Sequence, residues 1–435
     1  MKVIITGTVT LNGGDAAILI AEEELLREAL GSSLQVVVFD THPIAAHRHY
    51  PDYDFRLRLA KNGQRGPEGI PVLGGLIRRL NSRRYAFGVA VWLSRGRRMS
   101  RLLLSRREIR DLLEYQTADL VAFTGGTYLV ENYSLEWLSL ELKVISRLGK
   151  RYVLLPQSMG PFSGRLNRLK MAECLSGAEL VLLRDARSFS HATALAPANP
   201  RMLVVPDAAF GLRPREQLEG HSLDVRDPMA LRVAVSVREW PYFTTKPNSA
   251  GMADFMEAIA SAVVALVRHW GADVVFLSTC QGVSDYWTDD SRVASAIWSA
   301  VPDDVQAGAT VDSCFHDPRD LAGMLGRFDF TIATRLHAGI LSLLAGTPVL
   351  PISYEFKARE VFDELGFAEW VTDIESIQPG RFAALVENFV SQLPKLRVQV
   401  NEELPRQKAK LRQCVSPLSA AVRRERHDAR ASGRD

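Results

Sequence analysis

Four basic residues in the C-terminal half of the chain stand where a sheet could present them to an anion. Arg238 follows the apolar run "LRVAVSV", Arg335 and His337 follow "FDFTIAT", and Lys357 follows "TPVLPISYEF". Helix capping does not explain them, because the helix dipole disfavours cations at helix N-termini. Arginine can hold an anion bidentately and lysine acts as a point charge, so the set predicts an anion site to which Ser236 adds a hydroxyl group.

His337 differs from the other three because it can give up a proton near neutral pH. The unperturbed pKa of histidine is about 6.5, which suits a general acid. A core histidine bonded to a backbone carbonyl is the alternative that the sequence leaves open. Asp15 and Glu131, which also follow strand-like runs, are the candidate proton acceptors. The small residues Ala338 and Gly339 predict room for a ligand beside the histidine.

Six residues of the N-terminal half also follow strand-like apolar runs. They are Asn12, Gly14, Thr127, Gln157, Ser158 and Arg184. In open α/β sheets, ligands bind outside the carboxyl ends of the strands, so these positions predict a second binding surface. Turn formation and helix capping are the alternative roles for the small and polar residues among them.

The elements that would position these residues alternate regularly along the chain. The strand-like runs are "KVIITG", "LQVVVFD", "ADLVAFTGG", "RYVLLPQS", "AELVLLRD", "RMLVVPD", "LRVAVSVRE", "ADVVFLST", "FDFTIATR" and "TPVLPIS". Each is continuously apolar, as strands buried on both faces should be. Helical patterns separate them, and this alternation predicts parallel sheets with crossover helices. We therefore expect an α/β protein with doubly wound, Rossmann-like domains.

The length of 435 residues is too great for one ordinary core, so two domains are expected. A polar stretch at residues 212–229 interrupts the alternation and predicts a linker. The domains expected on either side are residues 1–211 and 230–370. Residues 371–435 are predicted to form C-terminal helices that end in a basic, partly disordered tail.

The composition excludes several classes of protein. A net charge of +3 and an apolar fraction of 47% are those of a globular chain. The four cysteines form no C-x-x-C pair, which argues against a zinc site or a disulfide framework. The loop "GTVTLNGGD" lacks the G-x-G-x-x-G spacing, and no P-loop motif occurs, so we expect neither a cofactor nor a metal. The N-terminus reads as a strand and no run approaches the ~20 apolar residues of a membrane span, so we expect a cytoplasmic protein.

The motifs taken together resemble those of the polysaccharide pyruvyl transferase family. The resemblance rests on "NGGD", "TGGTYLVEN", "LLPQSMGPF", "LLRDARS", "PDAAF", "VSVRE", "ATRLHAGI" and "AGTPVLPISYEFK", which span most of the chain. It implies two Rossmann-like domains that face a central cleft in a glycosyltransferase-B-like arrangement. It also implies phosphoenolpyruvate as the donor and a sugar of an exopolysaccharide or cell-wall glycan precursor, on a lipid carrier, as the acceptor.

The resemblance further implies a role for each group of residues. Arg238, Arg335, His337 and Lys357 would hold the donor, and loops of the N-terminal domain would hold the acceptor. Ketal formation needs a proton on the methylene carbon of phosphoenolpyruvate, for which His337 is the expected acid. Asp15 and Glu131 would then be bases for the sugar hydroxyl, with sugar binding or a structural role as the alternatives.

An arginine-rich segment lies inside residues 52–112, a region that matches no motif and reads as an insertion. Residues 76–110 contain eleven arginines and one acid, a net charge of 11 − 1 = +10. A solvated helix, a nucleic-acid patch and a membrane-surface helix are the three interpretations. No nucleic-acid-binding fold signature accompanies the segment, so we expect no nucleic acid partner. The apolar "YAFGVAVWL" between arginine pairs favours peripheral contact with anionic lipid on the inner face of the cell membrane.

Two other functions are compatible with the same residues. A nucleotide-sugar-dependent glycosyltransferase would also place arginine and lysine on a diphosphate. A catalytically silent anion-binding scaffold protein is the second. Release of phosphate from phosphoenolpyruvate, release of a nucleotide, or neither would separate the three.

Overall fold

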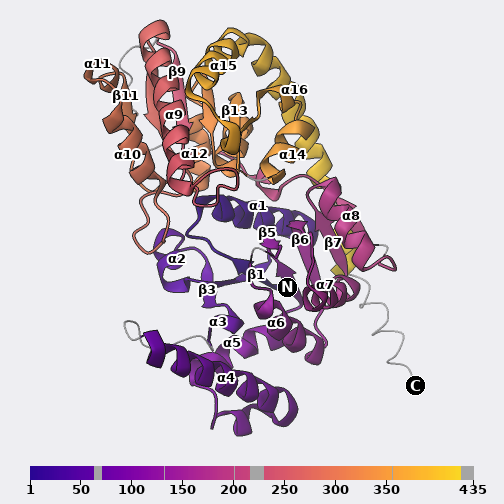
Figure 1. Ribbon diagram of the computed structural model, residues 1–435. Helices are drawn as coiled ribbons and strands as arrows, with labels where there is room; N and C mark the ends of the chain where they lie inside the picture. Colours follow the sequence, from indigo (N-terminus) through magenta and orange to yellow (C-terminus); the bar gives the residue numbers. More distant parts are fainter. Residues whose placement is uncertain (63–70, 132, 200, 216–229, 355, 423–435) are drawn as a thin grey trace. The chain divides into compact units, whose positions relative to one another are not determined.

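The computed structural model describes residues 1–62, 71–131, 133–199, 201–215, 230–354 and 356–422, but not the side chains of residues 71–74, 356 and 357. The chain divides into two compact units, each built around its own parallel sheet (Figure 1). The first unit comprises Met1–Thr10, Ile18–Ala208 and Lys410–Asp435. The second comprises Leu11–Ala17 and Ala209–Ala409.

The sheet of the first unit has eight strands in the order β3-β2-β1-β4-β6-β7-β8, with β5 paired to β6. The strands are β1 (Lys2–Thr8), β2 (Gln35–Asp40), β3 (Asp54–Leu57), β4 (Leu120–Phe123), β5 (Gly126–Leu129), β6 (Tyr152–Met159), β7 (Leu180–Leu183) and β8 (Met202–Val204). All of their pairings are parallel. The chain order reverses between β1 and β4, so the carboxyl ends of these two strands form the topological switch point of the sheet.

The helices of the first unit connect these strands and carry the arginine-rich segment. They are α1 (Gly13–Leu30), α2 (Pro43–His49), α3 (Leu59–Asn62), α4 (Pro71–Ser100), α5 (Arg106–Thr117), α6 (Glu136–Arg147), α7 (Arg165–Gly177) and α8 (Ala186–Leu195). One face of α4 is anchored in the core through Tyr85, Val89 and Trp92, which are buried. The start of α5 is fixed by a capping box in which Ser105 and Glu108 bond each other's backbone N–H groups.

The sheet of the second unit has six strands in the order β11-β10-β9-β12-β13-β14, again all parallel. They are β9 (Arg232–Ser236), β10 (Asp273–Phe276), β11 (Ala309–Val311), β12 (Phe330–Ala333), β13 (Val349–Ser353) and β14 (Thr372–Asp373). The helices are α9 (Asn248–Trp270), α10 (Asp290–Ala300), α11 (Asp303–Gln306), α12 (Pro318–Leu325), α13 (Leu336–Leu344), α14 (Phe356–Glu364), α15 (Pro379–Ser391) and α16 (Leu393–Arg412). The predicted α/β architecture with two parallel sheets is confirmed.

Helix α9 is long and apolar enough to cross a membrane by length and composition alone. It connects β9 to β10, and Figure 1 shows it beside α15, which it contacts. Phe255, Ile259 and Val263 on one of its faces are fully buried. These contacts are those of a crossover helix in an α/β core.

The division of the chain differs from the predicted ranges at both ends. Leu11–Ala17 belongs to the second unit, where the N–H of Gly13 donates to the carbonyl oxygen of Thr279 at 3.0 Å. The chain from Lys410 belongs to the first unit, where Arg151 donates to the carbonyl oxygens of Ala421 and Val422. Most of the predicted linker and the tail from residue 423 lie outside the described residues, so the linker and the tail stay predictions.

Candidate active site

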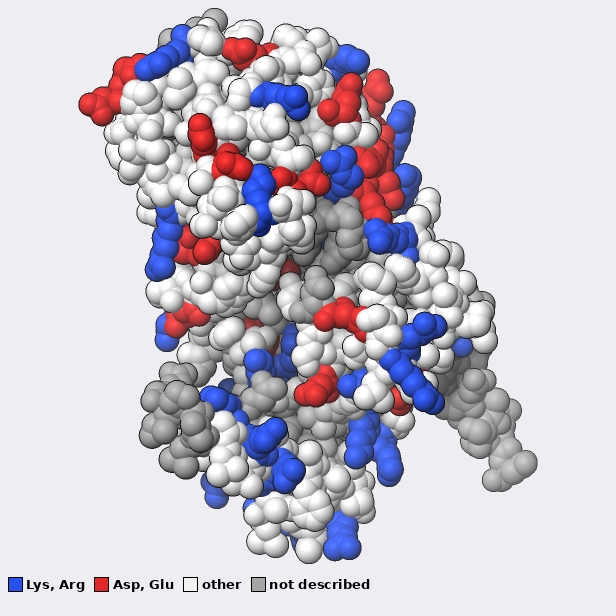
Figure 2. All heavy atoms as spheres, viewed as in Figure 1, with Lys and Arg blue, Asp and Glu red and all other residues white. Residues whose placement is uncertain are grey.

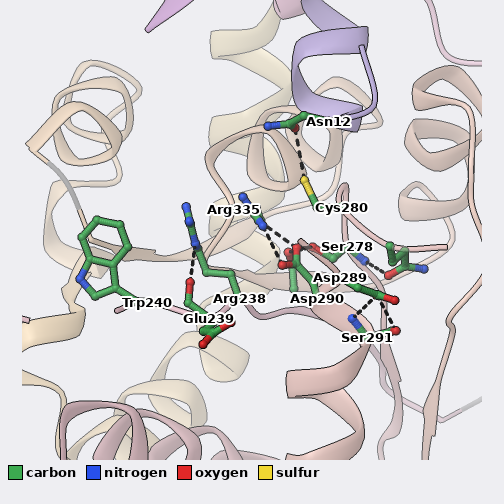
Figure 3. A network of polar contacts seen from close by, with 12 residues as sticks. Asn12, Arg238, Glu239, Trp240, Ser278, Cys280, Asp289, Asp290, Ser291 and Arg335 are labelled. Atoms are coloured by element: carbon green, nitrogen blue, oxygen red, sulfur yellow. Dashed lines mark hydrogen bonds and ion pairs between the residues drawn. The ribbon is translucent and has the colours of Figure 1, made fainter. Parts of the chain in front are cut away.

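Arg335 ends the turn between β12 and α13 and forms a buried ion pair with the first residue of α10. Its Nε donates to Oδ2 of Asp290 at 2.8 Å and its Nη2 donates to Oδ1 at 2.7 Å (Figure 3). Both side chains are buried. Burial lowers the pKa of Arg335, but the charge of Asp290 outweighs it and holds that pKa well above its usual value. The positive charge of Arg335 therefore has a partner within the protein.

A chain of hydroxyl groups connects this ion pair to the end of β9. Oγ of Ser278 donates to Oδ2 of Asp290 at 2.6 Å, and Oγ of Ser236 lies 3.0 Å from Oγ of Ser278. All of these residues are buried. Ser236, predicted as a donor-binding residue, is thus part of the network that holds Asp290 and Arg335 in place.

Arg238 lies at the carboxyl end of β9 in different surroundings. Its guanidinium carbon is 4.3 Å from the ring centroid of Tyr354 and 5.3 Å from that of Trp240. Its Nε donates to the backbone oxygen of Glu239 at 3.1 Å (Figure 3). Within the described part of the chain, Arg238 forms no ion pair with a carboxylate. Tyr354 also acts electrostatically on Arg335, so both arginines border the same tyrosine. Arg238 is therefore the cation of this pair whose charge a ligand could neutralise.

The segment Leu11–Ala17 brings part of the predicted acceptor set to the same unit. Sγ of Cys280 donates to Oδ1 of Asn12 at 3.3 Å. A Cβ atom on Gly14 would lie 2.5 Å from Nδ1 of His337, so only glycine fits against this ring. Burial and, to a lesser extent, the charge of Asp15 raise the pKa of Cys280 to about 11. The structure therefore places Gly14 against His337, and Asn12 and Asp15 near Cys280, whereas the sequence grouped Asn12 and Gly14 with the N-terminal acceptor residues.

His337 is the second residue of α13, whose N-cap residue is Arg335. The small residues behind it do not serve the predicted purpose. A Cβ atom on Gly339 would lie 2.6 Å from the ring of Phe362 in α14, and Ala338 is buried. The expectation that they make room for a ligand is therefore wrong, because Gly339 makes room for a core phenylalanine. Lys357 belongs to α14, but its side chain lies outside the described residues.

The other predicted acceptor residues come together in the first unit. Arg184 donates from Nε to Oγ of Ser158 and from Nη2 to Oγ1 of Thr127, both at 2.6 Å, and its Nη1 pairs with Asp207. The backbone N–H of Arg184 donates to the carbonyl oxygen of Gln157 at 3.0 Å. These contacts bring the four residues together in the first unit. Their polar groups bond one another, however, and Asp207 neutralises the arginine.

Glu131 has the contacts of a helix cap. Its two oxygens accept bonds from the N–H and hydroxyl of Ser163, the N–H of Gly164 and the amide of Asn167, at 2.6–3.0 Å. These bonds, led by that of the Ser163 hydroxyl, lower the pKa of Glu131 to about 2. A carboxylate with so low a pKa is a weak base at neutral pH, so the contacts weigh against the predicted catalytic role.

Comparison with known proteins identifies the family. Residues 12–355 match the family model of polysaccharide pyruvyl transferase. The chain belongs to the polysaccharide pyruvyl transferase family. The chain is 28% identical over 288 residues to the amylovoran biosynthesis protein AmsJ of Erwinia amylovora. The aligned region covers 65% of this chain and 68% of AmsJ.

Solved structures with little sequence identity share the fold. The structure of MnaA from S. aureus with UDP matches this chain with a TM-score of 0.55 at 11% sequence identity. The match covers 96% of this chain and 94% of the MnaA chain. The spinosyn rhamnosyltransferase SpnG, complexed with spinosyn aglycone, matches with a TM-score of 0.51 at 14% sequence identity. The match covers 98% of this chain and 100% of the SpnG chain. The family member described here therefore has a glycosyltransferase-B-like α/β fold.

Three residues that organise the site were missed in the sequence. Asp290 and Cys280 are separated from the predicted residues by long stretches of chain, whereas Trp240 lies two residues after Arg238. The "TDD" before α10 is an N-cap signal that could have drawn attention to Asp290, since Asp289 caps that helix. Nothing in the sequence indicates that the next residue turns inward to Arg335. Among the residues described, no group of His, Cys, Asp and Glu could hold a metal ion.

Proposed function

We propose that the protein transfers a pyruvyl group from phosphoenolpyruvate to a sugar of a polysaccharide precursor and forms a pyruvate ketal. The observation that carries this proposal is Arg238, whose guanidinium lies against the neighbouring rings of Tyr354 and Trp240 without a carboxylate partner in the described chain. A phosphate or a carboxylate is the ligand that a guanidinium in such surroundings favours. Family membership supports phosphoenolpyruvate as the molecule that carries both groups.

The reaction assigns a step to each group near Arg238. His337 donates a proton to the methylene carbon of phosphoenolpyruvate, and a sugar hydroxyl attacks the carbon that bears the phosphate. Phosphate then leaves with a proton, and a second hydroxyl of the same sugar closes the ketal. Asp15, on the segment whose Gly14 touches His337, is the candidate base for the hydroxyl groups. The ion pair of Arg335 with Asp290 fixes the start of α13, the helix that carries His337. We also propose that Arg335 and Lys357 contact the donor.

The acceptor is proposed to be a sugar of an exopolysaccharide precursor on a lipid carrier. The name of AmsJ, an amylovoran biosynthesis protein, supports this class of glycan. Acceptor contact by Thr127, Gln157, Ser158 and Arg184 is part of the proposal, although these residues bond one another in the first unit.

We also propose that the protein attaches to the inner face of the cell membrane through α4. Leu76, Leu80 and Phe87 are 55%, 56% and 62% exposed and share one face of the helix, opposite the face buried through Tyr85 and Trp92. Arginines flank this apolar stripe, and Figure 2 shows basic and uncharged side chains together in this region. An exposed apolar stripe between arginines fits an anionic lipid surface.

The experiment incubates the full chain with phosphoenolpyruvate and candidate lipid-linked saccharides. Release of phosphate, together with a gain of one pyruvyl ketal in the mass of a saccharide, is the expected result. His337→Ala should lose turnover by ~100-fold or more and still bind phosphoenolpyruvate, as loss of a general acid implies. Arg238→Met should instead weaken phosphoenolpyruvate binding by about 10-fold or more.

Arg268→Met is the matched control, because Arg268 pairs with Asp304 on the surface of the same unit. It should leave both turnover and binding unchanged. Nucleotide release from a UDP-sugar, with no phosphate release from phosphoenolpyruvate, would contradict the proposed reaction.

A further inference from the structure

Arg58 is a buried arginine that none of the roles described so far uses. It follows directly after β3. Only 7% of the residue is exposed, and its Nε and Nη2 atoms are buried with no hydrogen-bond partner in the described chain. Its guanidinium carbon lies 4.6 Å from the ring centroid of Trp137. Leaving the buried Nε and Nη2 groups of a guanidinium without hydrogen bonds is costly, which points to a partner that binds there.

The guanidinium lies at the topological switch point of the first sheet. Gly7 near the end of β1 and Thr124 directly after β4 mark the carboxyl ends of the two strands where the chain order reverses. A Cβ atom on Gly7 would have Thr124 at 3.4 Å, the ring of Trp137 at 3.7 Å and Nη2 of Arg58 at 3.9 Å. Gly7 has φ +100°, a conformation that glycine adopts without strain. Trp137, Arg58 and the backbone of Gly7 therefore lie together at the switch point, which is where ligands bind in this class of sheet.

The charges around Arg58 leave it positive. Burial, followed by the charge of Arg58, lowers the pKa of Lys61 in α3, so a second cation lies nearby. An acid in the vicinity is Glu141 of α6, which accepts a hydrogen bond from Thr6 at 2.9 Å and forms no ion pair with Arg58 in the described chain. Burial raises the pKa of Glu141 to about 7, although Arg58 opposes this shift. Glu141 therefore makes no direct pair with Arg58, and the buried Nε and Nη2 groups of the guanidinium can bond a ligand.

We propose that Arg58 binds an anionic group of the acceptor at this switch point. The inference rests on the proposed function, since it places the acceptor in the unit that does not contain Arg238. The anionic group is either the diphosphate that joins a sugar to its lipid carrier or the carboxylate of an acidic sugar. Both present paired oxygens to a guanidinium, and Trp137 holds that guanidinium in position.

The test measures anion binding by calorimetry in the full chain carrying Arg238→Met, so that the proposed donor site does not contribute. Inorganic pyrophosphate represents the diphosphate and glucuronate represents the acidic sugar. We expect one of them to bind, and the further change Arg58→Met to weaken that binding by about 10-fold or more. Arg56→Met is the matched control, because Arg56 pairs with Asp54 on the same strand.

Arg58→Met combined with Glu141→Gln removes the buried acid together with the buried cation, which protects the variant against unfolding. Loss of pyrophosphate binding in this folded variant would identify a diphosphate, and loss of glucuronate binding would identify a carboxylate. Unchanged binding of both anions, or no binding by the parent, would overturn the proposal. Neither outcome depends on phosphate release from phosphoenolpyruvate, so the inference and the proposed function fail separately.

Discussion

Arg238 and Arg335 follow the carboxyl ends of the neighbouring strands β9 and β12, but their surroundings differ and so do the roles we infer for them. Asp290 binds the guanidinium of Arg335 in the interior, where breaking such a pair is costly because one buried charge is left alone. Aromatic rings hold Arg238 without neutralising it. The pair with Asp290 therefore fixes the loop in front of His337, while Arg238 stays available to an anion.

The stability of the protein should depend on Glu131. Its pKa is about 2 in the folded protein and near 4.5 in the unfolded chain, so its bonds to Ser163 and Asn167 stabilise the fold above pH 4.5. That contribution is lost as the pH falls from about 4.5 to about 2. Glu131→Gln should therefore lower the thermal unfolding temperature at pH 7 and change it little near pH 2.

The control for this prediction is Glu136→Gln, since Glu136 is an exposed acid near the start of α6. It should leave the unfolding temperature nearly unchanged at both pH values. If Glu131→Gln kept full stability at pH 7 and abolished turnover, Glu131 would be a base and the capping interpretation would be wrong.

At the scale of elements, α4 combines an anchored face with an exposed apolar face. Leu80→Ser together with Phe87→Ser should weaken co-sedimentation with vesicles that contain phosphatidylserine by about 10-fold, because the helix loses apolar area that would enter the lipid. Raising the salt concentration should weaken binding of the parent protein, since each basic residue contributes ~1 kcal/mol at an anionic surface.

Leu169→Ser is the matched control for this experiment. Leu169 is equally exposed but belongs to α7. Co-sedimentation that is absent in the parent protein, or that is equally strong after the changes in α4, would show that this helix is a solvated surface.

At the scale of the whole molecule, the chain returns to its first unit after leaving it. Leu411, Cys414 and Leu418 are buried, and the carbonyl oxygens of Ala421 and Val422 accept bonds from Arg151 of the first unit. A chain shortened after Ala409 should therefore unfold at a lower denaturant concentration, because it exposes part of that core. A chain shortened after Val422 keeps all of these contacts and should unfold like the parent. Equal stability of the two shortened chains would contradict this role of residues 410–422.

The sequence by itself determined the α/β class, the family and most of the strand ends that carry polar residues. Continuous apolar runs can only be buried on both faces, so "VVVF" and "FTIA" indicate parallel strands without knowledge of their neighbours. The arginine, histidine and glycine residues at the ends of these runs could be found in the same way, because position along a strand is a local property.

Only the tertiary structure decided which charges remain for a ligand. Asp290 lies 45 residues before Arg335 and Trp137 lies 79 residues after Arg58, so no local pattern shows that these side chains meet. Hydrogen bonding and burial depend on such distant partners, and they separate the paired Arg335 from Arg238 and Arg58. The same dependence gives Glu131 the contacts of a helix cap and brings Gly14 against His337.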